Sequence, residues 1–201
     1  QADKTGDIDM LTLVKEYIKE KYNKPGNVYI GLVHRLDRPV GGVMVFAKTK
    51  VAAGKMSVLI QNGGFHKEYK AVLCGTPLDK SGELCDLLYH DKGKNKTYVV
   101  KRDRKGVKKA RLEYICLKQE ENTSLVQVRL HTGRSHQIRV QFSSRGFPLV
   151  GDHKYGSRSE LTEPLLYSCK ISFPYEGKTV QFEFYPEWAS ELQVKHHEGI
   201  S

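Results

Sequence analysis

The spacing of hydrophobic positions predicts two helices in the first third of the chain. From Met10 to Ile18, apolar side chains recur every three or four residues behind two acids, and Asn-Lys-Pro-Gly at 23–26 ends the pattern. A second helical pattern begins after Thr49, whose side chain can cap it, and stops at Gly63-Gly64. We therefore expect one helix from Met10 to the turn at 23–26 and another between Thr49 and Gly63.

Strand patterns occupy much of the remaining sequence. They fall at 28–33, 43–48, 67–73, 110–117, 125–131, 166–173 and 179–185. In the segment 125–131, Val126, Val128 and Leu130 share one face, and Gln127 and Arg129 lie on the other. Residues 76–96 show no clear period, so we expect irregular structure there.

Residues 135–145 fit both helix and strand periods. We predict a helix because Ser135 can cap its start, and Gly146 followed by Pro148 ends it. Helices and strands mix without strict alternation, and neither an internal repeat nor a flexible linker divides the chain. We expect an α+β fold in a single domain spanning residues 1–201.

Composition excludes several classes of protein. With 39% hydrophobic and 28% charged residues in 201, the chain is globular rather than disordered. No apolar run approaches the roughly 20 residues that span a bilayer, and the polar start has no signal-peptide core. The first residue is not Met, so we expect a fragment. Four widely spaced cysteines without a CxxC pair favour a reducing cytoplasm.

The net charge of +10 is concentrated in one segment. Residues 92–111 contain ten basic residues and one acid, so this segment carries +9 while the rest of the chain is nearly neutral. Such a balance favours an anionic partner, either nucleic acid or a membrane surface. The segment has too few apolar residues for an amphipathic membrane anchor, so we interpret it as either a solvated loop or an RNA-docking loop.

The loop 34–42 is the first candidate for chemistry. Asp37 lies between two predicted strands, flanked by Arg35 and Arg38, whose positive charges would keep the carboxylate ionised. Gly41-Gly42 would allow another stretch of backbone to approach closely. The alternative is an Asp that only shapes a turn.

Two further segments combine basic and aromatic side chains. From Asn122 to Gly151 there is no acid, and Arg134 and Arg139 flank the predicted helix start, which suits phosphate binding or pairing with a carboxylate. Tyr69 lies between lysines on a predicted strand, where it could stack on a base. A solvated helix face and a half-buried sheet tyrosine are the structural alternatives.

Metal and nucleotide cofactors find no support in the motifs. The histidines at 34, 131, 136 and 153 lack the spacing of a ligand set, so we expect no metal site. Neither a GxGxxG nor a GxxxxGK[ST] loop is present.

Taken in order, four segments resemble the RluA-type RNA pseudouridine synthases. They are GLVHRLDRPVGGVMVFAKT, KEYKAVLCG, LHTGRSHQIRVQFSSRGFPLVGDHKYG and LLYSCKISFP followed by VQFEFYPEW. The resemblance runs from about residue 1 to 188. The family's usual Lys-Pro-x-Gly strand and an N-terminal S4-like domain are not in this sequence, and Val40-Gly41-Gly42 replaces the common Thr-Ser-Gly. We therefore expect an N-terminally truncated catalytic domain.

The resemblance implies a pseudouridine synthase catalytic fold: a mixed, mostly antiparallel sheet with flanking helices and a central RNA-binding cleft. It implies isomerisation of uridine in rRNA or tRNA without a cofactor, by a protein that we expect to be a monomer. Roles carried over to this sequence are Asp37 as the catalytic aspartate, Arg139 as its basic partner and Tyr69 beside the target base. The resemblance also implies that Ile138 is the apolar residue near that base and that Arg35 helps to hold the flipped nucleotide.

Arg134 and His34 are further candidates for binding substrate, because they lie beside these motif residues. An alternative function is a catalytically idle RNA-binding protein of the same fold. A hydrolase using Asp37 and His34 would lack a second positioned acid or nucleophile.

Overall fold

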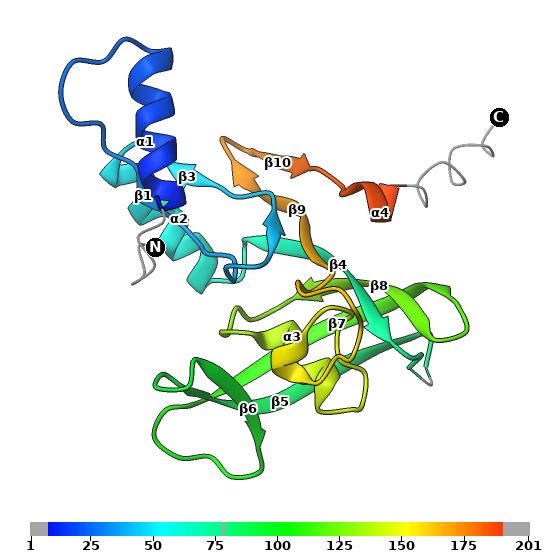
Figure 1. Cartoon of the computed structure of the whole chain (residues 1–201). Helices are drawn as coiled ribbons and strands as arrows, with labels where there is room; N and C mark the ends of the chain where they lie inside the picture. The colour runs from blue at the N-terminus through cyan, green and yellow to red at the C-terminus, as the bar shows by residue number, and fades with distance from the viewer. Residues whose placement is uncertain (1–7, 78, 191–201) are drawn as a thin grey trace. The chain divides into compact units, whose positions relative to one another are not determined.

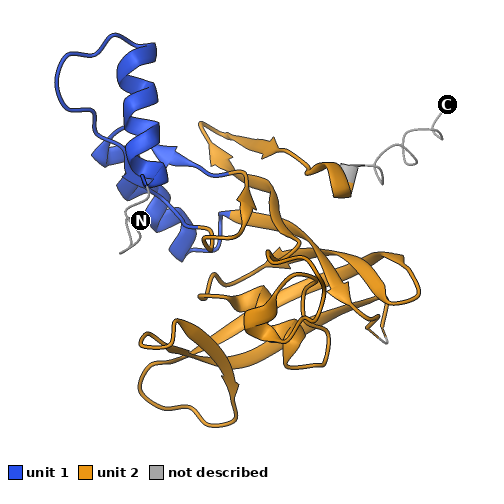
Figure 2. Ribbon diagram, viewed as in Figure 1, with its two compact units in different colours: residues 1–35, 44–65 blue, residues 36–43, 66–201 orange. Residues whose placement is uncertain are grey.

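The computed structural model describes residues 8–77 and 79–190, which fall into two compact units (Figure 2). The first unit is formed by Gln1–Arg35 with Met44–Phe65, and the second by Leu36–Val43 with His66–Ser201. A single domain over residues 1–201 stays a prediction.

The first unit contains both predicted N-terminal helices. Helix α1 (Met10–Lys21) begins where Asp9 Oδ1 accepts the N–H of Thr12 at 2.9 Å, and α2 (Lys50–Gln61) begins where Thr49 Oγ1 accepts the N–H of Ala52 at 3.1 Å. Each cap satisfies an N–H group that the first helical turn leaves free, so both predicted starts are confirmed.

The predicted strands at 28–33 and 43–48 are much shorter in the structure. Only β1 (Gly31–Leu32) and β3 (Phe46–Ala47) pair, in antiparallel register. The ladder stops at Val45 because its N–H donates to Nε2 of His34 at 3.1 Å instead of to a strand carbonyl. A side chain therefore replaces the next rung of this sheet.

The second unit is built on one mixed sheet, in which the strands of the main path are antiparallel (Figure 1). Their spatial order is β10-β9-β4-β8-β7-β5-β6. The bounds are β4 (His66–Cys74), β5 (Ser81–Asp91), β6 (Lys96–Val100), β7 (Val107–Gln119), β8 (Thr123–Leu130), β9 (Leu166–Tyr175) and β10 (Lys178–Glu183). The short strand β2 (Gly41–Gly42) pairs in parallel with β9. The predicted α+β class and mostly antiparallel sheet are confirmed.

The irregular structure predicted for 76–96 is wrong, because β5 occupies much of this range and pairs with β7 over nine positions. The polar side chain of Asp86 interrupts the apolar alternation between buried Leu84 and Leu88. Asp86 accepts hydrogen bonds from Gln141 and Arg145, and these contacts make a polar residue acceptable on this face. The basic segment 92–111 is likewise two strand segments joined by a loop, since it contains β6 and the start of β7.

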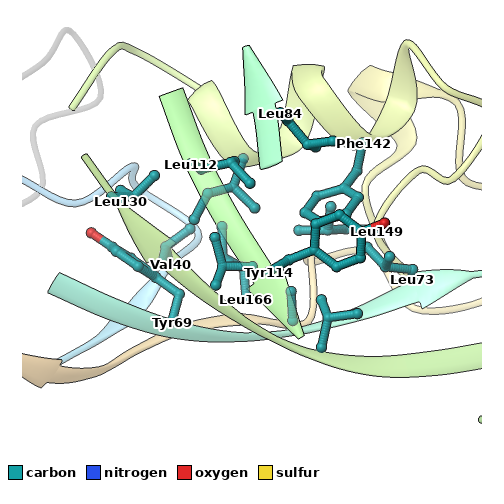
Figure 3. Close-up of a cluster of buried hydrophobic side chains, with 14 residues drawn as sticks. Val40, Tyr69, Leu73, Leu84, Leu112, Tyr114, Leu130, Phe142, Leu149 and Leu166 are labelled. Atoms are coloured by element: carbon teal, nitrogen blue, oxygen red, sulfur yellow. The ribbon is translucent and has the colours of Figure 1, made fainter. Parts of the chain in front are cut away.

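The main core lies between this sheet and α3 (Gln137–Ser143), as Figure 3 shows. Leu73, Leu112 and Leu149 are completely buried there. Phe142 of α3 packs its ring edge-on against Tyr114 of β7, with the centroids 5.4 Å apart. This packing fixes the helix that carries Ile138 and Arg139.

Helix α3 is shorter than predicted, and Ser135 does not cap it. The residue before the helix is His136, in the left-handed conformation with φ 53°. The side chain of Gln137 holds the preceding turn instead: its Oε1 accepts from the N–H of Arg134 at 3.0 Å and from the hydroxyl of Thr132 at 2.8 Å.

Two short helical segments complete the second unit, the 3₁₀ turn η1 (His153–Tyr155) and α4 (Glu187–Ser190). Within the described residues, no helix combines the length and the apolar composition needed to cross a membrane.

Gly42 allows the predicted close approach of two backbone segments. Its φ is +136°, and a Cβ at this position would lie 2.6 Å from the backbone nitrogen of Ser168. We expect Gly42→Ala to lower the free energy of unfolding by about 3 kcal/mol, since it combines backbone strain with a clash against β9. Thermal or urea denaturation measures this loss.

Gly177→Ala is the matched control, since Gly177 also has a positive φ (+75°) but open space around its Cβ position. Its cost should be about 1 kcal/mol. Equal losses in the two variants would show that the contact with β9 is unimportant.

Candidate active site

Asp37 is presented by a turn that is fastened to the sheet. The N–H of Val40 donates to the carbonyl of Asp37 at 2.9 Å, which closes the turn. Gly41 and Gly42 then pair with β9, and the N–H of Val43 donates to the carbonyl of Ser168 at 2.8 Å. The Asp37 side chain stays 26% exposed, so its carboxylate is both anchored and accessible.

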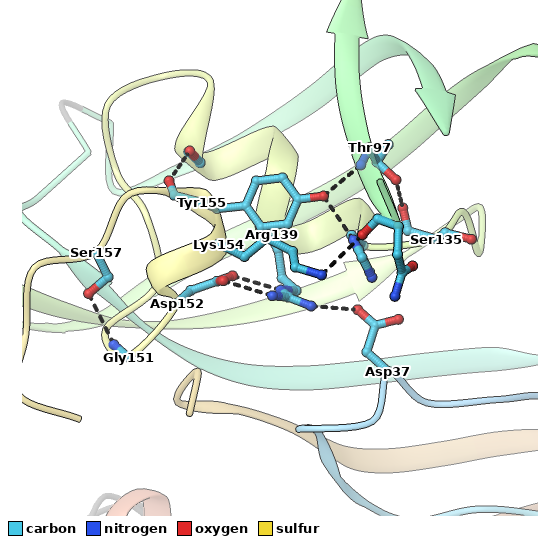
Figure 4. Close-up of polar contacts among 12 residues, drawn as sticks. Asp37, Thr97, Ser135, Arg139, Gly151, Asp152, Lys154, Tyr155 and Ser157 are labelled. Atoms are coloured by element: carbon cyan, nitrogen blue, oxygen red, sulfur yellow. Dashed lines mark hydrogen bonds and ion pairs between the residues drawn. The ribbon is translucent and has the colours of Figure 1, made fainter. Parts of the chain in front are cut away.

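Arg139 lies between two carboxylates (Figure 4). Its Nε donates to Oδ2 of Asp152 and its Nη2 to Oδ1, both at 2.7 Å, whereas Nη1 lies 3.5 Å from Oδ2 of Asp37. The first contact is a short, two-point ion pair, and the second is at the outer limit of a hydrogen bond. The predicted Asp37–Arg139 pair therefore exists, but Asp152 is the residue that fixes the guanidinium.

The electrostatic balance at Arg139 favours its charge. Burial is the largest influence and acts against ionisation, but the hydrogen bond and negative charge of Asp152, with help from Asp37, outweigh it and raise the pKa of Arg139. The guanidinium is thus a permanent positive charge. The Arg139 side chain that carries it is almost fully buried, at 6% exposure.

Asp152 is held in place by the backbone before it. Gly151 has φ +83°, and a Cβ there would overlap the carbonyl oxygen of Glu163, so only glycine fits. The N–H of Gly151 donates to the hydroxyl of Ser157 at 3.1 Å. No sequence pattern assigns a role to Asp152, although it stands within the motif PLVGDHKYG that carries the family resemblance.

Tyr69 and Ile138 form an apolar wall in the same unit. Both are buried and belong to the core cluster that also contains Val40. Burial raises the pKa of Tyr69 to about 12, with a smaller contribution from the negative charge of Asp37, and a hydrogen bond with Ser168 opposes the rise. The phenol is therefore neutral, and its ring can offer a flat, apolar surface close to Asp37.

A second polar network lies behind Arg139. The hydroxyl of Tyr155 accepts from the N–H of Thr97 at 2.8 Å and shares a 2.8 Å hydrogen bond with Nδ1 of His136. The hydroxyl of Thr97 donates to the carbonyl of Ser135 at 2.8 Å. Burial lowers the pKa of His136, against the attraction of Asp37, so the ring is favoured in its neutral form. These contacts bind β6, η1 and the start of α3 together.

The other predicted binding residues are in different surroundings. Nε of Arg134 donates to the carbonyl of Lys109 at 2.9 Å, so this side chain braces the turn against β7. His34 is buried in the first unit, where its ring packs at 5.3 Å from that of Phe65. Arg35 is exposed in that unit. Their contacts with substrate stay predictions.

Across the described residues, no group of three or more His, Cys, Asp or Glu side chains is arranged to hold a metal ion.

The buried Arg139–Asp152 pair makes Asp152→Asn a sensitive test of this site. The amide keeps the shape of the side chain but leaves Arg139 buried beside a neutral partner, so we expect the free energy of unfolding to fall by about 3 kcal/mol. Urea denaturation measures it. Glu83→Gln is the control, because it breaks an exposed pair with Arg111 and should leave stability unchanged. Similar losses in both variants would contradict the central place of the buried pair.

The sequence profile of the family described as RNA pseudouridylate synthase matches residues 5–144. An uncharacterized RNA pseudouridine synthase of Aquifex aeolicus is 36% identical over 166 residues, covering 79% of this chain and 51% of the relative. The ribosomal large subunit pseudouridine synthase D of Zymomonas mobilis is 31% identical over 176 residues, covering 82% of this chain and 54% of that protein. The chain thus spans about half the length of these curated relatives.

The fold is also shared with solved structures. Human RNA pseudouridylate synthase domain containing 4 superposes with a TM-score of 0.78 at 21% identity, over 94% of this chain and 84% of that one. The predicted RluA-type resemblance is confirmed by relatives of this kind. Since the family profile matches more than half of the residues, this chain belongs to the RNA pseudouridylate synthase family.

Proposed function

We propose that this chain is the catalytic part of an RNA pseudouridine synthase, with Asp37 as the reacting carboxylate. The observation that carries the proposal is the geometry around Arg139, which Asp152 grips at two points while a third nitrogen faces Asp37. A protein that only bound RNA would gain nothing from placing an accessible carboxylate in a basic site, because the carboxylate repels phosphate.

The reaction is an isomerisation, so its atoms balance without a co-reactant. The bond between N1 of uracil and C1′ of the ribose breaks, the detached uracil turns, and a bond forms between C5 and C1′. The proton on C5 leaves, and N1 gains one. The Asp37 carboxylate serves either by attacking C1′ or by attacking the pyrimidine ring.

The loose contact between Arg139 and Asp37 suits either role. The guanidinium of Arg139 places a fixed positive charge 3.5 Å from the Asp37 carboxylate, which is the nucleophile in this proposal. A tight two-point pair would occupy both oxygens of Asp37, but Arg139 makes that pair with Asp152 instead. Asp37 therefore keeps an oxygen free for the substrate while it stays beside a fixed positive charge.

The buried wall of Tyr69 and Ile138 would hold the uracil while it is detached. A target uridine must first leave the RNA stack, at a cost of a few kcal/mol. Stacking of the uracil on one aromatic ring contributes about 1–3 kcal/mol and so offsets part of this cost. In this proposal Arg35 contributes a further contact to the extruded nucleotide.

Ribosomal RNA is the first substrate to test. The names of the Zymomonas mobilis relative and of a Buchnera aphidicola relative refer to the ribosomal large subunit. We propose the same RNA class for this chain, with transfer RNA as the second candidate. Pseudouridine mapping of unmodified transcripts of both classes, incubated with and without the protein, distinguishes them.

Replacing the carboxylate tests its role directly. We expect Asp37→Asn to reduce pseudouridine formation by about a thousandfold or more, because the amide is not a nucleophile. Its affinity for RNA should stay within about twofold, since no positive charge is lost. Tritium release from RNA labelled at C5 of uridine measures turnover.

Asp103→Asn, in the exposed loop 101–106, is the matched control and should keep wild-type turnover. Retained turnover in Asp37→Asn would exclude Asp37 as the catalytic group. Binding without turnover by the wild-type chain would instead favour the idle RNA-binding alternative.

Arg139 separates a catalytic role from simple RNA binding. In Arg139→Lys the charge remains but the two-point contact with Asp152 is lost, so we expect kcat to fall by about a hundredfold with a small change in KM. Arg139→Ala should lose activity in the same direction, and denaturation of each variant checks that it is folded. An increase in KM at unchanged kcat would show that Arg139 only binds RNA.

A further inference from the structure

A basic groove lies beside the candidate site, between β6, α3 and η1. It has a volume of about 450 Å³, and its lining includes Lys96, Tyr98, His153, Lys154 and Tyr155. None of the described residues that line it is acidic. The chemistry proposed at Asp37 does not use this groove.

The two lysines of the groove carry charges that the described protein atoms do not neutralise. Nζ of Lys154 donates to the carbonyl of Asn95 at 3.2 Å, which is a dipole rather than an anion. Nζ of Lys96 lies 5.3 Å from the ring centroid of Tyr155 and 5.9 Å from that of Tyr98. No ion pair with a carboxylate involves either lysine within residues 8–77 and 79–190. Both ammonium groups can therefore accept an anion from outside.

Aromatic and apolar surface lies next to these charges. Tyr98 and Val99 are 37% and 36% exposed on β6, although this strand is part of the folded sheet. An exposed tyrosine beside a lysine, in a groove that a second lysine also lines, combines the two contacts that bind unpaired nucleotides: a stacking face for the base and cations for the phosphates.

Tyr155 connects the groove to the candidate site. Its ring centroid is 5.1 Å from Cζ of Arg139 as well as 5.3 Å from Nζ of Lys96, and Figure 4 shows this ring beside the contacts of Arg139. Arg139 contacts both the ring of Tyr155 and the carboxylate of Asp37, so it links the groove to the candidate site. An RNA strand in the groove would thus reach the site within the length of a few nucleotides.

We propose that this groove binds an unpaired RNA strand that flanks the target uridine. The inference rests on the proposed function for the identity of the target. A double helix cannot enter a space of this size, whereas a sugar–phosphate backbone with a splayed base can. Lys96 and Lys154 contact phosphates, and Tyr98 stacks on a base.

The rigidity of the groove supports this assignment. Thr97 is 1% exposed and binds Tyr155 through its N–H and Ser135 through its hydroxyl. The lysines of β6 and η1 are therefore held on a fixed frame, so little ordering is required when a strand binds.

The test uses the whole chain and a fluorescent oligouridylate of about twelve nucleotides, a length that covers a typical single-strand site. We expect the double variant Lys96→Gln, Lys154→Gln to bind it about tenfold more weakly, with the slope of log affinity against log salt reduced by about 1.4 because two phosphate contacts are lost. The double variant Lys80→Gln, Lys178→Gln removes the same charge from exposed positions outside the groove. Equal behaviour of the two double variants overturns the proposal.

Tyr98 provides a second, independent readout. Tyr98→Ala should weaken binding about tenfold, and Tyr98→Phe should restore it, because stacking needs the ring and not the hydroxyl. Ultraviolet crosslinking to the oligouridylate should label the peptides that contain Tyr98 or Tyr155. Crosslinks confined to other peptides overturn the assignment.

The outcomes distinguish this inference from the proposed function. If the chain forms no pseudouridine in any RNA but the groove variants lose affinity and salt dependence, the groove stands and the enzyme proposal fails. If the wild-type chain is active and the groove variants bind RNA as it does, the groove proposal fails alone.

Discussion

The two-point ion pair between Arg139 and Asp152 is the interaction on which the candidate site depends. Both side chains are almost completely removed from water, so each would be costly to bury alone. The ion pair offsets the free-energy cost of burying the guanidinium, and it also fixes the orientation of that group. Because two of its nitrogens are committed to Asp152, the third is directed at Asp37. The weak contact is thus a consequence of the strong one.

The sheet supplies the frame for this arrangement. Asp37 lies on a loop that is held to β9 by the pairing of Gly42. Tyr69 belongs to β4, the strand next to β9 in the sheet. Arg139 comes from α3, which packs on the same core through Phe142 and Ile138. Three segments that are far apart in sequence therefore meet on one rigid support. The precision of the site comes from this support and not from the loop itself.

Local signals in the sequence predicted what local physics controls. The helix start behind the acids near Asp9, the cap at Thr49 and the alternating strand β8 follow from the nearest neighbours, and the structure contains each of them. The strand β5 was missed because Asp86 points inward, where it pairs with Gln141 of α3 and with Arg145, both far away in sequence. The role of Asp152 was missed for the same reason. It depends on the ion pair with Arg139, which no periodicity in the sequence reveals. Buried polar residues are therefore the places where sequence patterns mislead.

The positive charge on the edge strand β6 has two consequences. Since β6 ends the sheet, its outer edge offers unpaired backbone groups, and such edges invite pairing with other chains. The N–H of Thr97 is occupied by Tyr155, and Lys96 begins the strand with a charge that disfavours sheet extension. The same charge, placed beside Tyr98 and close to Lys154, attracts a phosphate backbone. The positive charge at the edge of β6 therefore disfavours pairing with a β-strand of another protein. It favours contact with a nucleic-acid strand, because the phosphates are negatively charged.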